Sequence, residues 1–239
     1  MLQRITDPWF EFAGVKNTTL GVMLLAMPQR QHAARRGDYT PPIPGRDGNL
    51  WRDGGGYDNI TVPVQCYVEN PSNISTVMNW LTGLGYLRFS DDPDRAYRAR
   101  VTKTFNRSPK MARFTAQEFT VTFDCHPSRF VYPIPTIILV SGMPVTNSGT
   151  QYAEPKITLT GSGDIALTIG AQTLNVTGLA SKIALDMEAR VAYNPDDTTQ
   201  NLCSTVSGDW PLLIQPGSNA VSWTGTVSAV SMVANWRDI

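Results

Sequence analysis

The chain has 239 residues with 20 basic and 20 acidic side chains, so its formal net charge is zero and gives no argument for nucleic-acid binding. Hydrophobic residues make up 41% and charged residues 17%, a balance that provides for a sizeable core and argues against long disordered stretches. The longest apolar runs, residues 20–27 and 133–140, are much shorter than the roughly 20 residues of a membrane-spanning helix.

The chain begins with two predicted strands and continues into a long polar segment. Residues 9–25 predict two short strands around a turn at Gly14–Asn17. Residues 28–59 are rich in Arg, Gly and Pro, and stretches of this length without an apolar face are usually functional arms or disordered. Asp47–Gly48 within them is a hairpin turn signal. We therefore expect a β-hairpin arm over about residues 28–59.

Residues 60–125 predict further strands and a single helix. Ile60–Val68 and Phe114–Cys125 alternate between apolar and polar residues, as half-buried strands do, and residues 86–89 and 97–105 predict strands on either side of a turn at 90–93. Ser72 is a suitable helix N-cap, and apolar residues recur after it at helical spacing: Ile74, Val77, Met78 and Leu81. Gly83 or Gly85 then ends a helix of about three turns, which we expect to cover a sheet.

The strand pattern breaks over residues 127–135, which contain three prolines, and we place a domain boundary there. The charge balance changes too, because residues 1–132 carry 16 basic and 12 acidic side chains and residues 133–239 carry 4 and 8. Turn signals at Gly161–Gly163, Gly170, Gly178 and Pro216–Gly217 then separate short strand candidates. The candidates are residues 136–141, 156–160, 165–169, 173–176, 183–187, 191–193, 212–214, 220–223 and 226–233. This spacing is typical of an antiparallel β-sandwich.

The cysteines and histidines form no recognisable reactive site. Cys66, Cys125 and Cys203 lie far apart, and the first two continue apolar strand faces, which predicts buried free thiols. His32 and His126 are the two histidines, and no G-x-S-x-G elbow accompanies them. The adjacent Cys125 and His126 point to opposite faces of a strand, which argues against joint catalysis.

The acidic pairs Asp91–Asp92 and Asp196–Asp197 adjoin prolines and predict turns rather than metal sites. Gly54–Gly56 lacks the Lys and Ser or Thr that a phosphate-binding loop requires. The sequence therefore predicts no catalytic, cofactor-binding or metal-binding residues, no cofactor, and a protein that is not an enzyme.

An ordered series of short motifs resembles the distal tail proteins (Dit) of siphophages. The most specific is the run Trp80–Pro93, with glycines at 83 and 85. The others, in chain order, are Phe10-x-Phe12-x-Gly14, Gly45–Gly48 with Gly56–Tyr57, Tyr97–Ala99, Phe119-x-Val121-x-Phe123-x-Cys125, Asn147–Gly149, Ala153-x-Pro155-x-Ile157, Gly161–Gly163, Asp186, Tyr193, Gly208–Pro211, Pro216–Asn219 and Trp236–Arg237. Each is a turn or a packed aromatic residue, and their order over residues 10–237 carries the resemblance.

The resemblance implies a mainly β protein. An N-terminal β-barrel or sandwich belt domain at residues 1–132, with one short helix and the hairpin arm, precedes a galectin-like antiparallel β-sandwich at residues 136–239. The implied function is that of a structural virion protein of a long-tailed bacteriophage, whose homohexameric ring joins the tail tube to the tail-tip or baseplate hub and serves as an attachment platform for host-adhesion proteins.

The resemblance also implies the partners and the location. The tail tube protein is expected on one face of the ring, a tail-tip hub or tail-associated protein on the other, and receptor-binding or baseplate proteins around it. No specific nucleic-acid binding and no membrane contact are expected. The expected location is the phage tail tip, after assembly in the bacterial host cytoplasm.

Two alternatives remain open. A galectin-like sandwich suggests a carbohydrate-binding, lectin-like protein that stacks sugars on Trp210 or Trp223, although only Arg190 and Arg237 supply arginines in this half and it has no histidine. Fold analogy alone is not evidence of sugar binding. A secreted hydrolase is disfavoured, because the N-terminus lacks a signal-peptide cleavage pattern and no catalytic pair is visible.

Overall fold

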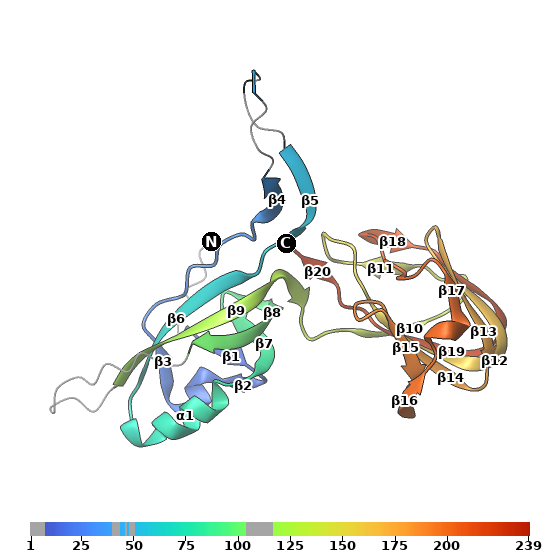
Figure 1. Ribbon diagram of the computed structural model, residues 1–239. Helices are drawn as coiled ribbons and strands as arrows, with labels where there is room; N and C mark the ends of the chain where they lie inside the picture. Colours follow the sequence, from blue (N-terminus) through green and yellow to red (C-terminus); the bar gives the residue numbers. More distant parts are fainter. Residues whose placement is uncertain (1–7, 40–43, 46, 48–50, 104–116) are drawn as a thin grey trace. The chain divides into compact units, whose positions relative to one another are not determined.

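The computed structural model describes residues 8–39, 44–45, 47, 51–103 and 117–239 (Figure 1). The chain forms two compact units, residues 1–129 with Ile239 and residues 130–238. The described residues are mainly β-strand with one α-helix, as predicted, and the galectin-like character of the second unit stays a prediction. No helix in this part of the chain is long and apolar enough to cross a membrane.

The first unit is built on one sheet with the strand order β2-β1-β7-β8-β9-β6-β3. Its strands are β1 (Phe10–Phe12), β2 (Val15–Lys16), β3 (Val22–Leu24), β6 (Ile60–Val68), β7 (Leu84–Phe89), β8 (Asp92–Lys103) and β9 (Gln117–Val131). Strands β6 and β9 pair antiparallel from Ile60 opposite Cys125 to Val68 opposite Gln117. The alternation predicted for both strands is confirmed, since Val62, Val64 and Cys66 are buried, as are Phe119, Val121, Phe123 and Cys125.

Strand β9 differs from the prediction because it continues through Pro127 to Val131. Proline cannot donate a ladder hydrogen bond and is tolerated where none is needed. The β6 ladder ends at the Ile60–Cys125 pair, so Pro127 lies beyond it. The proline that suggests a break in the strand pattern therefore lies inside a strand.

The N-terminal segment forms three short strands rather than two. A tight turn at Ala13 and Gly14, both with positive φ, separates β1 from β2, so the predicted turn at 14–17 lies too late in the chain. A 3-10 helix, η1 (Asn17–Leu20), then leads to β3. Asn17, which the sequence places in a turn, is fully buried.

The predicted helix exists but is shorter and begins later. A 3-10 turn, η2 (Pro71–Asn73), leads into α1 (Ile74–Trp80), and the N-cap is Asn73 without a side-chain hydrogen bond rather than Ser72. Val77 and Leu81 are buried, whereas Met78 is exposed. The Trp80 ring stacks on Phe10 at 5.4 Å between ring centroids, and its indole N–H donates to the Phe12 carbonyl oxygen. The helix therefore covers the sheet, as expected.

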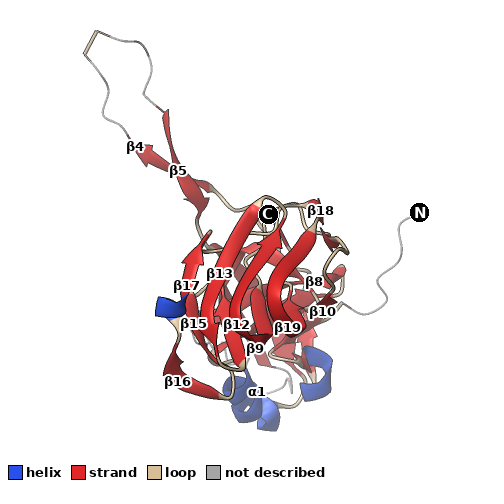
Figure 2. Ribbon diagram, turned by 90° about the vertical axis from the view of Figure 1, so that its right-hand side faces the viewer, coloured by secondary structure: helices blue, strands red, loops and turns tan. Residues whose placement is uncertain are grey.

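The second unit contains a sheet with the order β10-β19-β12-β14-β15-β16, in which β13 also pairs with β12 and with β17. Strands β12 and β19 lie side by side along it (Figure 2). Its strands are β10 (Thr136–Leu139), β12 (Lys156–Ile169), β13 (Gln172–Leu179), β14 (Lys182–Asp186), β15 (Val191–Asn194), β16 (Asp197–Asn201), β17 (Val206–Gly208) and β19 (Val221–Val233).

Several short elements complete this unit. They are β11 (Val145–Asn147), which pairs with β18 (Gly217–Asn219), a 3-10 helix η3 (Cys203–Thr205), and β20 (Arg237–Asp238), which pairs with β9. The strand predicted at 212–214 is instead a single bridge between Ala153 and Ile214. The predicted turn at Gly170 is confirmed between β12 and β13.

The predicted turn at Gly161–Gly163 is wrong. Residues 156–169 form one strand, β12, which pairs along its length with β19, itself predicted as two strands. The register between them shifts after Thr160 and again after Ser162, and a Cβ on Gly161 would lie 2.3 Å from the Thr226 carbonyl oxygen. A glycine in such a sequence can mark a turn, a β-bulge or a close approach of two backbones. Here Gly161 lies at a register shift where the backbones of β12 and β19 approach closely.

Candidate functional site: the arm and the pocket at its root

The arm is a two-stranded sheet of its own. Strands β4 (Arg35–Tyr39) and β5 (Trp51–Tyr57) pair antiparallel, with a register irregularity between Arg35 and Gly37. The hairpin extends away from the other strands of the first unit (Figures 1 and 2). The predicted hairpin arm is confirmed, and its predicted Asp47–Gly48 turn lies partly outside the described residues.

Two contacts close the base of the arm. The Asp58 backbone N–H donates to the Ala34 carbonyl oxygen at 3.0 Å, and the Arg36 Nε donates to the Asp58 carboxylate at 2.7 Å. A Cβ on Gly54 would lie 2.8 Å from the Arg36 carbonyl oxygen, so a glycine is required for the two strands to approach this closely. The Gly-rich segment 54–56 thus has a structural role in the hairpin.

The segment that leads into the arm is fastened to the β7–β8 turn. The Arg30 guanidinium forms an ion pair with Asp91, and its central carbon lies 4.8 Å from the centroid of the Phe89 ring. The Ser90 hydroxyl contacts the Met27 sulfur at 3.9 Å. We call this segment, residues 27–33, the arm root. An ion pair, a cation–π contact and a contact of the Met27 thioether attach it to the β7–β8 turn.

The acidic pair of this turn has two separate partners. Asp91 binds Arg30, and the Asp92 carboxylate accepts a hydrogen bond from Arg129 of β9 at 2.9 Å. The turn predicted at these residues is confirmed, since β7 and β8 are joined there. Each aspartate therefore binds a different arginine: Asp91 binds Arg30 from the segment before the arm, and Asp92 binds Arg129 from β9. No cluster of three or more possible metal ligands occurs among the described residues.

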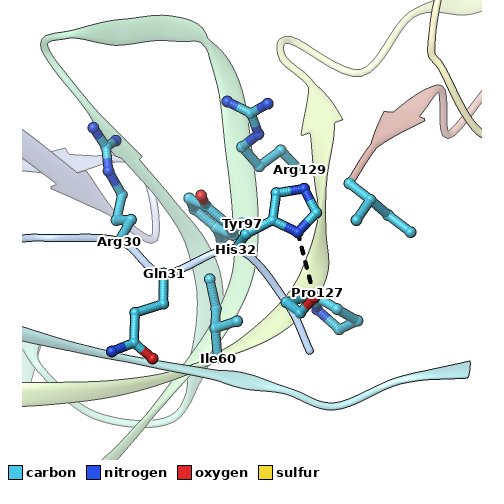
Figure 3. A pocket seen from close by; sticks show the side chains of 9 residues that line it. Arg30, Gln31, His32, Ile60, Tyr97, Pro127 and Arg129 are labelled. Atoms are coloured by element: carbon cyan, nitrogen blue, oxygen red, sulfur yellow. Dashed lines mark hydrogen bonds between the residues drawn. The ribbon is translucent and has the colours of Figure 1, made fainter. Parts of the chain in front are cut away.

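A pocket of about 270 Å³ lies beside this turn (Figure 3). Its lining combines the arm root with residues of β6, β8 and β9 and with the last residue of the chain: Arg30, Gln31, His32, Ala33, Ile60, Tyr97, Pro127, Arg129 and Ile239. Figure 3 shows the Tyr97 hydroxyl lying between the side chains of Arg30 and Arg129. The pocket thus has an apolar wall and a rim of hydrogen-bond donors.

Tyr97 is nearly buried, with 8% of its surface exposed. Burial raises the pKa of its phenol, while the positive charges of Arg129 and Arg30 act in the opposite direction. Its hydroxyl makes no hydrogen bond to another described residue.

Neither histidine stands in a catalytic arrangement. The His32 ring nitrogen Nδ1 lies 3.3 Å from the Ala33 carbonyl oxygen, drawn as a dashed line in Figure 3. The His126 Nδ1 accepts a hydrogen bond from the Ser128 backbone N–H at 3.1 Å. Cys125 is fully buried whereas His126 is half-buried, so the two adjacent residues face opposite sides of β9, as predicted.

The thiols of the first unit are buried and free, as predicted. Burial raises the pKa of Cys66 and that of Cys125 to about 12, and the neighbouring charge of Asp124 adds to the shift for Cys125. A thiol of this kind stays protonated at neutral pH and is a poor nucleophile. Cys203 of the second unit is half-exposed and accepts a hydrogen bond from the Ala192 N–H at 3.1 Å.

The two tryptophans expected to stack on a sugar, and one of the two arginines of this half, are engaged in packing. The side chains of Trp210 and Trp223 are half-buried against the core of the second unit. Arg237 is buried, forms an ion pair with Glu154 at 3.0 Å and lies over the Tyr152 ring at 4.8 Å. These contacts give no support to an exposed lectin-type site built on these three residues.

The sequence does not predict the pocket. Its residues come from the arm root, from β6, β8 and β9 and from the last residue, Ile239, and no local motif links them. One signal points toward it: Tyr97 occupies an inward position of β8, next to buried Ala96 and two residues before buried Ala99. A tyrosine at such a position brings a polar tip into an otherwise apolar layer.

Comparison with known proteins gives two kinds of match. Residues 16–125 match the family model of the phage tail protein RIFT-related domain. The fold resembles the Dit protein of phage SPP1, described as a paradigm of the hub adsorption apparatus in phages that infect Gram-positive bacteria, with a TM-score of 0.63 and 16% identity over 95% of this chain and 98% of that one.

A second solved structure is similar over the same extent. The baseplate of phage p2, in its activated conformation with strontium, contains a chain that matches with a TM-score of 0.53 and 7% identity over 95% of this chain and 97% of that one. No curated protein sequence matches the chain.

Proposed function

We infer that this chain is a siphophage tail protein of the distal tail (Dit) type. The observation that carries this conclusion is the phage tail domain at residues 16–125, joined to a fold that resembles phage SPP1 Dit over nearly the whole of both chains. The similar proteins are structural components of phage tails and baseplates, in agreement with the prediction that this chain is not an enzyme.

We propose further that it forms a homohexameric ring through its N-terminal belt domain, residues 1–132, with the arm as a contact between neighbours. A closed ring requires heterologous contacts, in which one surface meets a different surface of the next subunit. An isolated two-stranded hairpin is marginally stable in water, and β4 and β5 pair only with each other among the described strands. A neighbour's sheet edge is a suitable partner for such a hairpin.

The remaining roles in this proposal follow from the position of such a ring in a tail. The tail tube protein binds one face, and a tail-tip hub or tail-associated protein binds the other. The C-terminal domain, residues 136–239, lies outside the ring, where receptor-binding or baseplate proteins attach. The protein works in the virion at the tail tip, after assembly in the host cytoplasm, and binds no nucleic acid specifically.

Electron microscopy of the purified full chain, combined with light scattering, tests the ring. The expected result is a closed ring with a molar mass six times that of the 26.3 kDa chain. A variant with residues 36–53 replaced by a short Gly-Ser linker should remain folded and lose the ring, because the proposed donor surface is gone.

A matched control changes an exposed hairpin of the second unit instead. Asp197 and Thr199 of β16 are exposed, so the double variant Asp197→Ala/Thr199→Ala should assemble as the parent does. A monomeric parent chain at high concentration would contradict the ring. Rings formed by the arm-deleted variant would show that the arm is not the contact.

A further inference from the structure

The pocket at the arm root has an unused set of hydrogen-bond donors. Tyr97, a residue with 8% of its surface exposed, brings a hydroxyl that has no hydrogen-bond partner among the described residues. The guanidinium groups of Arg30 and Arg129 lie on either side of it (Figure 3). Each uses one nitrogen on an aspartate, and the other N–H groups have no acceptor among the residues that the structure describes. Guanidinium has five N–H donors, so each arginine has donors to spare.

The positive charge in this pocket comes from its two guanidinium groups, and each of them also forms an ion pair with an aspartate. Burial acts against the anionic form of the Tyr97 phenol and raises its pKa, whereas the charges of Arg129 and Arg30 act in favour of that form and Asp92 opposes them. The two aspartates thus hold the arginines in place, while the guanidinium charges still act at the Tyr97 hydroxyl. Hydrogen bonds from charged donors to an anionic oxygen are stronger than those between neutral groups.

The rest of the lining limits the size and shape of the occupant. Ala33, Ile60 and Pro127 supply an apolar wall beside the donors. The volume of about 270 Å³ accommodates a short aliphatic stem together with a planar anionic head. A short carboxylic acid, or an acidic side chain of a protein, combines these two parts.

We propose that this pocket binds a carboxylate group on a short aliphatic stem, with the anionic oxygens accepting hydrogen bonds from Tyr97, Arg30 and Arg129. The occupant ties the arm root, which contributes Arg30, to strands β8 and β9, which contribute the other two donors. The carboxylate has two possible sources, a free small acid or an acidic side chain of a second copy of this chain.

Titration of the full chain with sodium propionate tests the pocket, with sodium chloride at equal ionic strength as the reference. The side-chain N–H signals of Arg30 and Arg129 are followed by NMR at a dilution where the chain is monomeric. Propionate should shift both signals saturably, and chloride should not. Equal effects of the two salts, or shifts that grow linearly without saturation, would overturn the proposal.

The variant Tyr97→Phe keeps the ring and removes only the hydroxyl. It should lower the propionate affinity about tenfold, because one hydrogen bond to a charged group is lost. Its unfolding midpoint should match that of the parent, since the lost hydroxyl has no described partner. Tyr193→Phe, in the second unit, is the matched control and should bind as the parent does. Parent-like affinity in Tyr97→Phe would exclude the assigned donor.

A second part of the experiment identifies the source and rests on the proposed ring. If a second copy supplies the carboxylate, propionate should dissociate the assembled protein at concentrations where chloride does not, and Tyr97→Phe should weaken assembly. If a free acid supplies the carboxylate, the protein should assemble to the same extent in sodium propionate and in sodium chloride. A chain that does not assemble at all would contradict the ring, while the titration of the monomer would still decide the pocket.

Discussion

The side-chain amide of Asn17 donates a hydrogen bond to the carbonyl oxygen of Val22 at 2.8 Å, inside the first unit. Its side-chain oxygen accepts a second one from the Phe10 N–H, also at 2.8 Å. Phe10 belongs to β1 and Val22 to β3, which stand near opposite ends of the strand order. One fully buried amide therefore links two strands that are not neighbours in the sheet.

We expect Asn17→Ala to lower the free energy of unfolding of the first unit by about 2–4 kcal/mol, because two buried backbone groups lose their partners. Urea unfolding followed by tryptophan fluorescence measures this change. Asn79→Ala, at an exposed position of α1, is the control and should change stability little. A loss below about 0.5 kcal/mol in Asn17→Ala would mean that water replaces the amide.

Gly161→Ala should destabilise the second unit by about 2–4 kcal/mol, because its Cβ would meet the backbone of β19 and force the two strands apart. Gly142→Ala is the comparison, since its Cβ meets nothing within 4 Å and only its positive φ is penalised. That variant should lose about 1–2 kcal/mol. Thermal unfolding compares the stabilities of the two variants. An equal loss of stability in both would show that β12 and β19 adjust to the added methyl group.

Thiol reagents should modify Cys203 much faster than Cys66 or Cys125 in the folded chain. The first is half-exposed, and the other two are buried with pKa values raised to about 12. Mass spectrometry after brief treatment with iodoacetamide at neutral pH should find one modified cysteine, and three after unfolding in guanidinium chloride. Early modification of Cys66 would indicate that the core of the first unit opens readily.

The same two thiols should make the first unit less stable in alkali. Their pKa is about 12 in the folded protein, against 9.0 for an unperturbed thiol. Above about pH 9 the unfolded chain therefore binds fewer protons than the folded protein, and the free energy of unfolding falls as pH rises. Below that pH both states hold the proton, so the two thiols add no pH dependence.

Urea unfolding at about pH 8 and about pH 10 measures this loss. The double variant Cys66→Ala/Cys125→Ala should have a lower free energy of unfolding at both pH values, because two core side chains are shortened. Between the two pH values, its free energy of unfolding should fall less than that of the parent. Cys203→Ala should lose as much as the parent. An equal loss in the double variant would assign the alkaline effect to other groups.

Local periodicity by itself determines much of the first unit. The alternation of Ile60–Val68 predicts a strand with those bounds, and the alternation around Phe119 and Phe123 predicts the inward face of β9. These predictions hold because a strand buried on one face needs an apolar residue at every second position, which is visible along the chain. The hairpin arm is predictable for a related reason, since its long polar segment has no apolar face to bury.

Only the tertiary structure decides which residues interrupt strands and which lie within them. Gly161 and Pro127 both predict interruptions, and both lie inside strands. A neighbouring strand approaches closely at Gly161, and the ladder to β6 ends before Pro127. The buried Asn17 and the pocket of Arg30, Tyr97 and Arg129 are equally hidden in the sequence. The pocket residues are distant along the chain, and contacts between distant residues follow from packing rather than from local pattern. The partners of Asn17 are only five and seven residues away, but they lie on two different strands, and no local pattern indicates that the amide between them is buried.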